Sequence, residues 1–403
     1  MTPESVQACI VDPTKALPLL KELLQTSHLP ALEAYLQKST SNRALLSRIA
    51  SRALEYPSAF PDPLHLLSPG DLLTLSCYQI SIILSNAFFC AFEDQGVGKC
   101  ARLSFDSLFN LAANPQSNAK LNCLMHYFDR VTEDGVDLHQ KVTFERLQCT
   151  QFPSWGRLDQ TRLYPFSIQS HGSIEEDGQG MLQLDFANKC IGGGVLRHGL
   201  VQEEILFLIK PECLVSRLIT SELQDHEALL IRGAQRYSKH QGYRQSFRWM
   251  GDYRETIEES LDGHLRTEIL AIDAYDFSSN PRRQFQEKYI LRELNKAYVG
   301  FSSQSPVLGN KCPIATGNWG CGAFGGDRET KFLIQWIVAS VVQRPMVYFT
   351  FGDVPLMEHA RQLGARLLQS EISVGQLARA LLSYEADQGS KTTMFSFIER
   401  TIL

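Results

Sequence analysis

The sequence has little net charge and no tail of a single sign. Its 403 residues include 39 basic and 44 acidic side chains, which gives a formal net charge of −5. Without a basic stripe, binding to long DNA or RNA through counterion release is not expected, although a local pocket for a phosphate-bearing ligand stays open. The length allows two or three domains, or one large domain with an extension, and the hydrophobic share of 44% is enough for a sizeable core.

The ten cysteines form no Cys-x-x-Cys pair and no dense cluster. This spacing is typical of a protein from a reducing compartment. The first residues lack the basic and apolar segments of a secretory signal, and Glu4, Asp12 and Glu22 argue against a transit peptide. We therefore expect a protein of the nucleus or cytoplasm.

One stretch without charge, from Leu72 to Phe92, is long enough to span a bilayer. Polar Thr, Ser, Gln and Asn side chains interrupt it, and lipid would satisfy these groups poorly. The stretch is therefore expected to be a buried helix, and no binding to a membrane is expected.

Two patterns divide the chain. Residues 1 to about 135 carry apolar side chains at helical spacing, which predicts a mostly helical accessory region with helices at 16–25, 29–37, 43–55 and 72–92. Nothing in this region suggests chemistry, so a layer for packing or interaction is expected.

From about residue 160, short β-branched and aromatic runs alternate with helical segments. The expected strands cover 181–186, 228–231, 268–272 and 346–351, and the expected helices lie near 200–209, 284–299 and 329–342. This alternation predicts an α/β domain, and the apolar strands favour a three-layer sandwich with helices on both faces of the sheet.

Several familiar catalytic motifs are absent. The sequence has no His-Glu-x-x-His, no Gly-x-Ser-x-Gly and no pair of Cys and His clusters at zinc spacing, so neither a metal nor a cofactor is expected. A Gly-x-Gly-x-x-Gly occurs at Gly320, Gly322 and Gly325, but a dinucleotide fold would need an acidic residue about 20 positions later, where Pro345 stands. Such a loop can still bring its N–H groups close to phosphate oxygens.

The strongest pattern runs from Asp185 and Asn188 to three glycines, Gly192 to Gly194, and after seven residues to Gln202-Glu203-Glu204. Three consecutive glycines after a strand remove every Cβ from a turn, which is useful where something large approaches the main chain. If a helix begins near Leu200, the two glutamates lie in its first turn, at the mouth of the glycine loop. Glutamates also occur at helix N-termini merely because they complement the dipole, so the pair alone would not establish a function.

These residues resemble the poly(ADP-ribose) glycohydrolase family. Its signature is a Gly-Gly-Gly and a Gln-Glu-Glu separated by a short spacer, here Gly192 to Gly194 and Gln202 to Glu204. The likeness covers roughly residues 70 to 385. It includes Gln79 to Phe92, Tyr127 to Thr132, Gly172 to Glu175, Gly178 to Asn188, Gln235 to Ser238, Glu293 to Gly300, Ala315 to Asp327 and Tyr348 to Asp353.

The resemblance implies a three-layer α/β/α macrodomain over residues 136–403, preceded by a helical accessory region over 1–135. It also implies hydrolysis of the ribose-to-ribose bonds of poly(ADP-ribose) with release of ADP-ribose, a role in the response to DNA damage, and poly(ADP-ribosyl)ated proteins as partners. A monomer is expected.

Roles for single residues follow from the same resemblance. Glu204 is expected to be the general acid and base, while Glu203, Asp185 and Asn188 orient the ribose that is cleaved. The other implied ligand contacts are Ile174 and Glu175 at the adenine edge, Gly192, Gly193, Gly194, Gly320, Gly322, Ala323, Phe324 and Gly325 at the diphosphate, Phe351 at an adenine or ribose face, and Gln202, Tyr237, His240 and Asn318.

The chemistry also favours a single acid. Neighbouring residues on a helix point about 100° apart, so Glu203 and Glu204 cannot stand on opposite faces of one sugar ring as paired carboxylates do. One glutamate is therefore expected to protonate the leaving oxygen and then to deprotonate water. A non-catalytic ADP-ribose reader would need the glycine loops but neither glutamate, and a scaffold would need neither set, so hydrolysis is favoured.

One position departs from the family pattern. The family has a second tyrosine three residues after the tyrosine of the Gln-x-Tyr-Ser segment, whereas His240 stands there in this chain. An imidazole in that place would stack less well and would add a charge switch near pH 6.5. Alternatively, His240 points to solvent and Tyr243 or Phe351 makes the contact.

Overall fold

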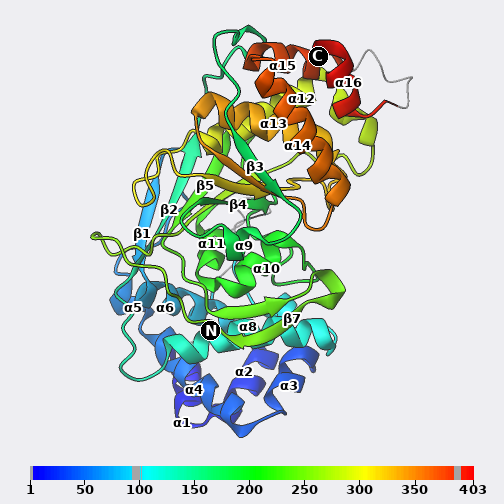
Figure 1. Cartoon of the computed structure of the whole chain (residues 1–403). Helices are drawn as coiled ribbons and strands as arrows, with labels where there is room; N and C mark the ends of the chain where they lie inside the picture. The colour runs from blue at the N-terminus through cyan, green and yellow to red at the C-terminus, as the bar shows by residue number, and fades with distance from the viewer. Residues whose placement is uncertain (1–2, 93–99, 101, 385–391) are drawn as a thin grey trace. The chain divides into compact units, whose positions relative to one another are not determined.

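The computed structural model describes residues 3–92, 100, 102–384 and 392–403. They form two compact units, each assembled from three separate segments of the chain (Figure 1). Unit 1 comprises Met1–Phe144, Asn188–Glu222 and Ile231–Leu265, and unit 2 comprises Glu145–Ala187, Leu223–Leu230 and Arg266–Leu403.

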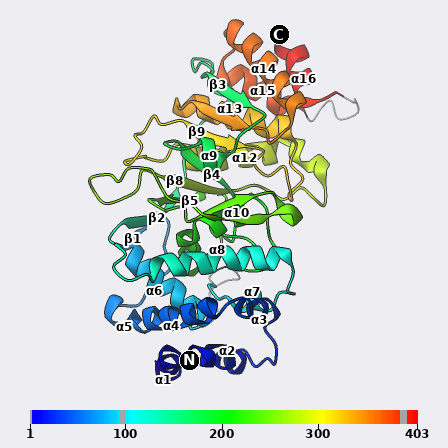
Figure 2. The ribbon, with the colours of Figure 1, turned by 60° about the horizontal axis from the view of Figure 1, so that its bottom comes forward.

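Unit 1 is mainly helical. Its helices are α1 (Pro3–Val11), α2 (Ala16–Leu23), α3 (Pro30–Leu36), α4 (Thr40–Leu54), α5 (Tyr56–Ala59), α6 (Cys77–Phe88), α7 (Asp106–Phe109), α8 (Pro115–Val131), α10 (Gln202–Ile209) and α11 (Ser216–Ile219). Figure 2 shows α1 and α2, α4, and α8 as successive rows. The hairpin of β6 (Ser238–Gln241) and β7 (Arg248–Asp252) lies against α8 (Figure 1). The helical N-terminal region predicted from the sequence is thus confirmed.

The uncharged stretch from Leu72 to Phe92 is not one helix, and that prediction was wrong. Its first residues form strand β1 (Leu72–Ser76), and only Cys77–Phe88 is helical. Ser76 sets the boundary, because its Oγ accepts from the Gln79 N–H at 3.2 Å while the Gln79 Oε1 accepts from the Ser76 N–H at 3.0 Å. This reciprocal cap starts a helix within an apolar run that periodicity alone reads as continuous.

One sheet contains eight strands in the order β1-β2-β5-β8-β4-β9-β10-β3. Besides β1 these are β2 (Lys141–Gln148), β3 (Phe166–Gln169), β4 (Leu182–Ala187), β5 (Glu227–Arg232), β8 (Glu268–Asp273), β9 (Ile314–Gly317) and β10 (Met346–Phe349). Strand β4 is parallel to β8 and β9, and β10 is parallel to β9 and β3. Every residue of β5 and β8 is buried, as in strands covered on both faces. The four predicted strands are confirmed as β4, β5, β8 and β10.

Unit 2 contains α9 (Ile174–Asp177), α12 (Glu287–Phe301), α13 (Arg328–Val342), α14 (Val354–Gln369), α15 (Val374–Ser383) and α16 (Met394–Ile402). Helix α13 lies at the centre of its core, where Trp336 is fully buried and donates from Nε1 to the Tyr164 carbonyl at 2.7 Å. The large sheet together with these helices confirms the predicted α/β class.

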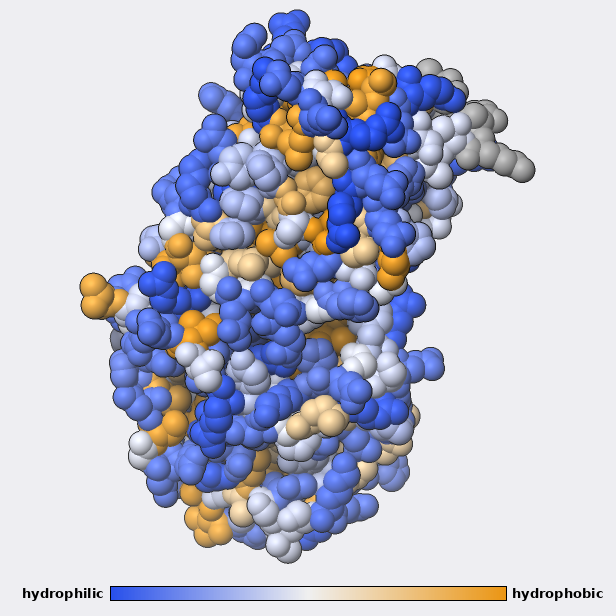
Figure 3. Space-filling model, viewed as in Figure 1, coloured by the Kyte–Doolittle hydropathy of each residue, from blue (hydrophilic) through white to orange (hydrophobic). Residues whose placement is uncertain are grey.

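In the described part of the chain, none of the helices combines the length and the apolar character needed to cross a membrane. The face drawn in Figure 3 is largely hydrophilic, with its hydrophobic residues in separate groups.

Candidate active site

The triglycine loop and the first turn of α10 lie against each other in unit 1. Helix α10 begins at Gln202, which confirms that Glu203 and Glu204 occupy its first turn. Both glutamates are nearly inaccessible, with 2% and 6% of their surfaces exposed. Carboxylates buried to this degree need hydrogen-bond donors, and the loop supplies them from its backbone.

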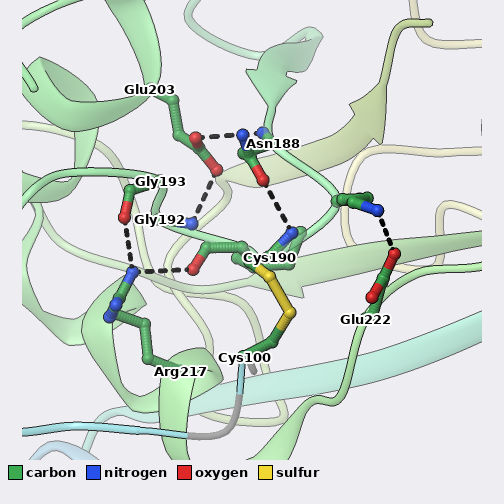
Figure 4. Close-up of a disulfide and its surroundings, with 10 residues drawn as sticks. Cys100, Asn188, Cys190, Gly192, Gly193, Glu203, Arg217 and Glu222 are labelled. Carbon is green, nitrogen blue, oxygen red and sulfur yellow. Dashed lines mark hydrogen bonds and ion pairs between the residues drawn. A yellow bond between two sulfur atoms is a disulfide. The ribbon is translucent and has the colours of Figure 1, made fainter. Parts of the chain in front are cut away.

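Glu203 is held at both oxygens. Its Oε2 accepts from the Asn188 N–H at 3.0 Å and its Oε1 accepts from the Gly192 N–H at 2.6 Å (Figure 4). The Asn188 side chain is used locally, because its Oδ1 accepts from the Cys190 N–H at 3.0 Å. Glu203 therefore links Asn188, the residue after β4, to Gly192, the first glycine of the triglycine.

Glu204 is held in the same manner one residue later. Its Oε1 accepts from the Gly194 N–H at 2.9 Å, and its Oε2 accepts from the N–H of Val201, the residue before the helix, at 2.8 Å. A carboxylate oxygen has two acceptor sites, so each oxygen of Glu204 retains one for a further partner.

Two glycines make room for these carboxylates. A Cβ on Gly193 would lie 2.6 Å from the Glu204 Oε1 and 2.7 Å from the Glu203 Oε2, and the residue has φ +45°. A Cβ on Gly199 would lie 2.5 Å from the Glu204 Oε1. Glycine is therefore needed at these positions so that the loop can lie close to the glutamates, and it also lets a ligand come close to the backbone.

Two cations bind the carbonyl side of the same loop. Arg217 of α11 donates from Nη1 to the Ile191 carbonyl at 3.1 Å and to the Gly193 carbonyl at 3.0 Å (Figure 4). Lys120 of α8 donates from Nζ to the carbonyls of Val195 at 2.9 Å and Arg197 at 2.6 Å. Burial lowers the pKa of both side chains.

The histidine and tyrosines of the Gln-x-Tyr-Ser region differ in accessibility within unit 1. Tyr237 is buried, and its hydroxyl donates to the Glu212 Oε1 at 2.7 Å, so that hydroxyl is used inside the protein. His240 is half-buried, with its ring centroid 6.0 Å from that of Phe247. Tyr243 is exposed, and its pKa is raised by partial burial and also by the charge of Glu204.

In unit 2, Lys331 of α13 packs against the start of the second glycine loop. The Lys331 Nζ lies 4.0 Å from the centre of the Trp319 ring and pairs with Glu293 of α12. A Cβ on Gly320, which has φ +73°, would lie 2.4 Å from the Ala274 Cβ. The Gly320 carbonyl accepts from the Gly326 N–H at 2.9 Å, which closes the loop that contains Gly322, Ala323, Phe324 and Gly325.

Phe351 has a backbone conformation that is rare for a large residue. Its φ is +52°, the residue is 45% exposed, and its ring lies edge-on to that of Phe186, with the ring centroids 6.5 Å apart. Strand β10 ends at Phe349, two residues earlier than predicted. A strained, exposed aromatic residue is typical of a functional surface.

The other predicted ligand residues of unit 2 are largely internal. Asn318 donates from Nδ2 to the Thr350 carbonyl at 3.1 Å and accepts from the Tyr348 hydroxyl at 3.0 Å. Ile174 is buried with Ala315, whereas Glu175 beside it is partly exposed. Asp185 is fully buried on β4, where it lies opposite Ala271 of β8.

Lys120, Arg217 and Gly199 were not predicted from the sequence, and neither was the disulfide between Cys100 and Cys190, whose Cα atoms are 4.9 Å apart. Only Gly199 carried a local signal, because it lies between the two halves of the signature. In the described ranges, no three His, Cys, Asp or Glu side chains are grouped so as to hold a metal ion.

Two family models match the chain. One, described as "Poly (ADP-ribose) glycohydrolase (PARG), Macro domain fold", matches residues 152–358, and the other, described as the helical domain of the same family, matches residues 36–146. The chain belongs to the poly(ADP-ribose) glycohydrolase family. This match confirms both the resemblance found in the sequence and the macrodomain fold class with its helical region.

Curated relatives agree with this family. Poly(ADP-ribose) glycohydrolase 1 of Arabidopsis thaliana is 32% identical over 403 residues, which cover 81% of this chain and 72% of the relative. Poly(ADP-ribose) glycohydrolase 1 of Caenorhabditis elegans is 33% identical over 369 residues, which cover 87% of this chain and 46% of the relative.

Proposed function

We propose that this chain hydrolyses the ribose-to-ribose bonds of poly(ADP-ribose) and releases ADP-ribose. The observation that carries the proposal is the placement of Glu204: its carboxylate lies in the first turn of α10, against Gly193 and Gly199, with each oxygen held by one backbone N–H. A non-catalytic ADP-ribose reader would have no use for a carboxylate in this position.

In the proposed reaction Glu204 protonates the departing ribose 2′ oxygen while an oxocarbenium-like ribose forms. It then removes a proton from the attacking water. The two N–H donors keep the carboxylate in one place through both steps, because each of its oxygens can accept a second hydrogen bond.

Glu203 has a different task in this proposal. Glu203 accepts from the N–H groups of Asn188 and Gly192 and so fixes these two residues. The family resemblance implies that Glu203 orients the ribose and that Glu204 transfers the proton. Asn188 and Asp185 orient the ribose that is cleaved, as the family resemblance implies, and Gln202 contributes at the helix terminus.

The remaining ligand contacts are proposals from the same resemblance. The triglycine loop and the loop of Gly320 to Gly325 bind the diphosphate, Ile174 and Glu175 bind the adenine edge, and Phe351 covers an adenine or ribose face. The exposed, left-handed Phe351 supports this role for its ring. Tyr243 is the better candidate than Tyr237 for a ligand contact in unit 1, since Tyr237 is buried.

We further propose that the partners are poly(ADP-ribosyl)ated proteins, that the chain acts as a monomer in the nucleus or cytoplasm, and that residues 1–135 form an accessory region to the catalytic domain of residues 136–403. The lack of basic excess argues against direct reading of DNA or RNA.

The test is to incubate the purified protein with an automodified poly(ADP-ribose) polymerase and to measure released ADP-ribose by chromatography. Wild type is expected to release ADP-ribose, and Glu204→Gln is expected to bind ADP-ribose without releasing it from the polymer. Tight binding by wild type without any release would instead identify a reader.

A further inference from the structure

Arg217 contacts the triglycine loop from the side opposite to the two glutamates. A single atom, Nη1, donates to the carbonyls of Ile191 and Gly193. Figure 4 shows the guanidinium group on one side of the loop and Glu203 on the other.

These two carbonyls belong to the peptide groups that hold the glutamates. The carbonyl of Ile191 and the N–H of Gly192 share one planar peptide, and so do the carbonyl of Gly193 and the N–H of Gly194. The Gly192 N–H donates to Glu203 and the Gly194 N–H donates to Glu204. Since a trans peptide directs its C=O and N–H to opposite sides, an arginine on the carbonyls sets where the N–H groups point.

Glycine makes this external support necessary. Gly192 and Gly193 have φ +81° and +45°, and a chain of glycines has the widest choice of alternative peptide orientations. A flip of either peptide would turn a carbonyl oxygen toward a buried carboxylate. Burial lowers the pKa of Arg217, and the negative charges of Glu203 and Glu204 act against this shift.

We propose that Arg217 is a positioning residue for hydrolysis: it fixes the peptide planes of the triglycine loop so that their N–H groups hold Glu203 and Glu204. The proposal rests on the proposed function. It goes further because it assigns the placement of Glu204 to Arg217 of α11, which acts on Glu204 through the loop backbone.

The test compares Arg217→Ala with Arg344→Ala. Arg344 is a matched control because it is a buried arginine that also donates to two carbonyls, those of Cys312 at 2.9 Å and Phe301 at 3.2 Å, but belongs to unit 2. Arg217→Ala is expected to lower kcat at least tenfold, because misplacement of a catalytic group by about 1 Å can cost 10²-fold. Added guanidinium chloride, at concentrations below denaturation, should restore part of that kcat in Arg217→Ala and none in Arg344→Ala.

Wild-type kcat in Arg217→Ala, or a loss that guanidinium does not reverse although the variant melts like wild type, would overturn the proposal. If the alanine variant is insoluble, Arg217→Gln is measured in its place, and the proposal requires the same fall in kcat of at least tenfold. Glu204→Gln is measured alongside: an active Glu204→Gln refutes the proposed function itself, whereas an inactive Glu204→Gln with a fully active Arg217 variant refutes only the positioning role.

The disulfide of Cys100 and Cys190 is a separate observation on the same loop. It joins residues 90 positions apart, and Cys190 lies between Asn188 and the triglycine (Figure 4). The Cys190 carbonyl accepts from the Gly193 N–H at 3.0 Å, so the bonded residue is part of the loop's hydrogen-bond pattern. The other described cysteines are free.

We infer that this pair is a peroxide-sensitive switch of the loop, again on the basis of the proposed function. One thiolate attacks a peroxide oxygen and becomes a sulfenic acid with loss of hydroxide, and the second thiolate displaces hydroxide from that sulfur; in sum, two thiols and one hydrogen peroxide give one disulfide and two waters. A dithiol reverses the bond by two exchange steps. In a reducing compartment such a bond is typically transient and regulatory.

The bonded form restrains residue 190, so oxidised protein is expected to bind ADP-ribose several-fold more tightly than protein reduced with dithiothreitol. The difference should persist in Cys149→Ser, a half-buried control cysteine, and vanish in Cys100→Ser. Calorimetry gives the affinities, and mass spectrometry of peptides confirms the bond. Equal affinities of the oxidised and reduced wild type, an unchanged difference in Cys100→Ser, or no bond after peroxide would each overturn the switch.

Discussion

Gly193 has no space for a side chain, because its Cα faces the carboxylates of both Glu203 and Glu204. The glycine pattern was interpreted from the sequence as a cradle for phosphate. The structure adds that the same residue determines how closely the loop can approach the acid. A substitution there therefore acts on chemistry as well as on ligand binding.

Gly193→Ala is expected to lower kcat and ADP-ribose affinity together, each at least tenfold, because the methyl group would lie within 2.7 Å of both carboxylates at a φ of +45°. Gly135→Ala is the matched control, since Gly135 has φ +77° with nothing within 4 Å of the added Cβ. Calorimetry gives the ADP-ribose affinity and initial rates give kcat for both variants. Wild-type affinity in Gly193→Ala would contradict the cradle.

His240 is the residue at which this chain departs from its family, and its half-buried ring lies near Phe247. If it contacts the ligand, protonation adds a positive charge near a diphosphate, so ADP-ribose should bind more tightly at about pH 5.5 than at about pH 8. His240→Tyr should flatten this dependence and keep or improve affinity. Parallel curves for the two proteins in calorimetric titrations would make His240 a bystander.

Helix α8 contributes Lys120 to the segment that connects the triglycine to α10. Its Nζ contacts four carbonyls of that segment, those of Gly194, Val195, Arg197 and Gly199. Burial lowers the pKa of Lys120 to about 7, while Glu204 of α10 and Cys123 of α8 act in the opposite direction. The side chains of Arg197 and His198 on the segment itself are exposed.

Only the ammonium form can donate three hydrogen bonds, so kcat should fall as the pH rises through about 7 and Lys120 becomes neutral. The same shift in pKa changes stability in the opposite direction to kcat. Because the folded pKa lies below the ordinary value of 10.5, the unfolded chain binds more protons between these values, and this group makes the free energy of unfolding rise with pH there.

Lys120→Met should lower kcat at least tenfold at pH 6.5 to about 7 and remove this alkaline fall. Lys210→Met is the control, since Lys210 is a buried lysine of unit 1 whose Nζ faces the Ala234 carbonyl. Rates and melting temperatures are measured over the same pH range. An alkaline loss of activity that follows a loss of stability, or that persists in Lys120→Met, would contradict this role.

At the scale of the whole molecule, contiguous features could be predicted and distant ones could not. The start of α10 at the glutamates was predictable, because helix initiation depends on neighbouring residues. Arg217 and Lys120 bind carbonyls 24 and 74 residues or more away in the sequence, and spacing gives no sign of such contacts. The boundary at Ser76 was missed because a single cap outweighed the apolar periodicity around it.

The first 60 residues carry no predicted site residue, but α4 packs on α6. The Asn86 Nδ2 donates to the Ala53 carbonyl at 2.9 Å, and the Tyr78 hydroxyl donates to the Glu55 Oε2 at 2.6 Å. Deleting residues 1–60 is therefore expected to lower the melting temperature or the solubility, without a selective change in chemistry. A soluble truncation with normal thermal stability and no activity would show that this region takes part in catalysis.

The most direct measurement concerns Glu204. Turnover of poly(ADP-ribose) and calorimetric binding of ADP-ribose are measured for wild type and Glu204→Gln, with melting temperatures as the check on folding. The amide keeps the shape and loses the transferable proton, so kcat should fall by about 10² to 10⁴ while ADP-ribose affinity stays near that of wild type. A Glu204→Gln variant that retained more than about a tenth of the wild-type kcat would show that another group is the acid.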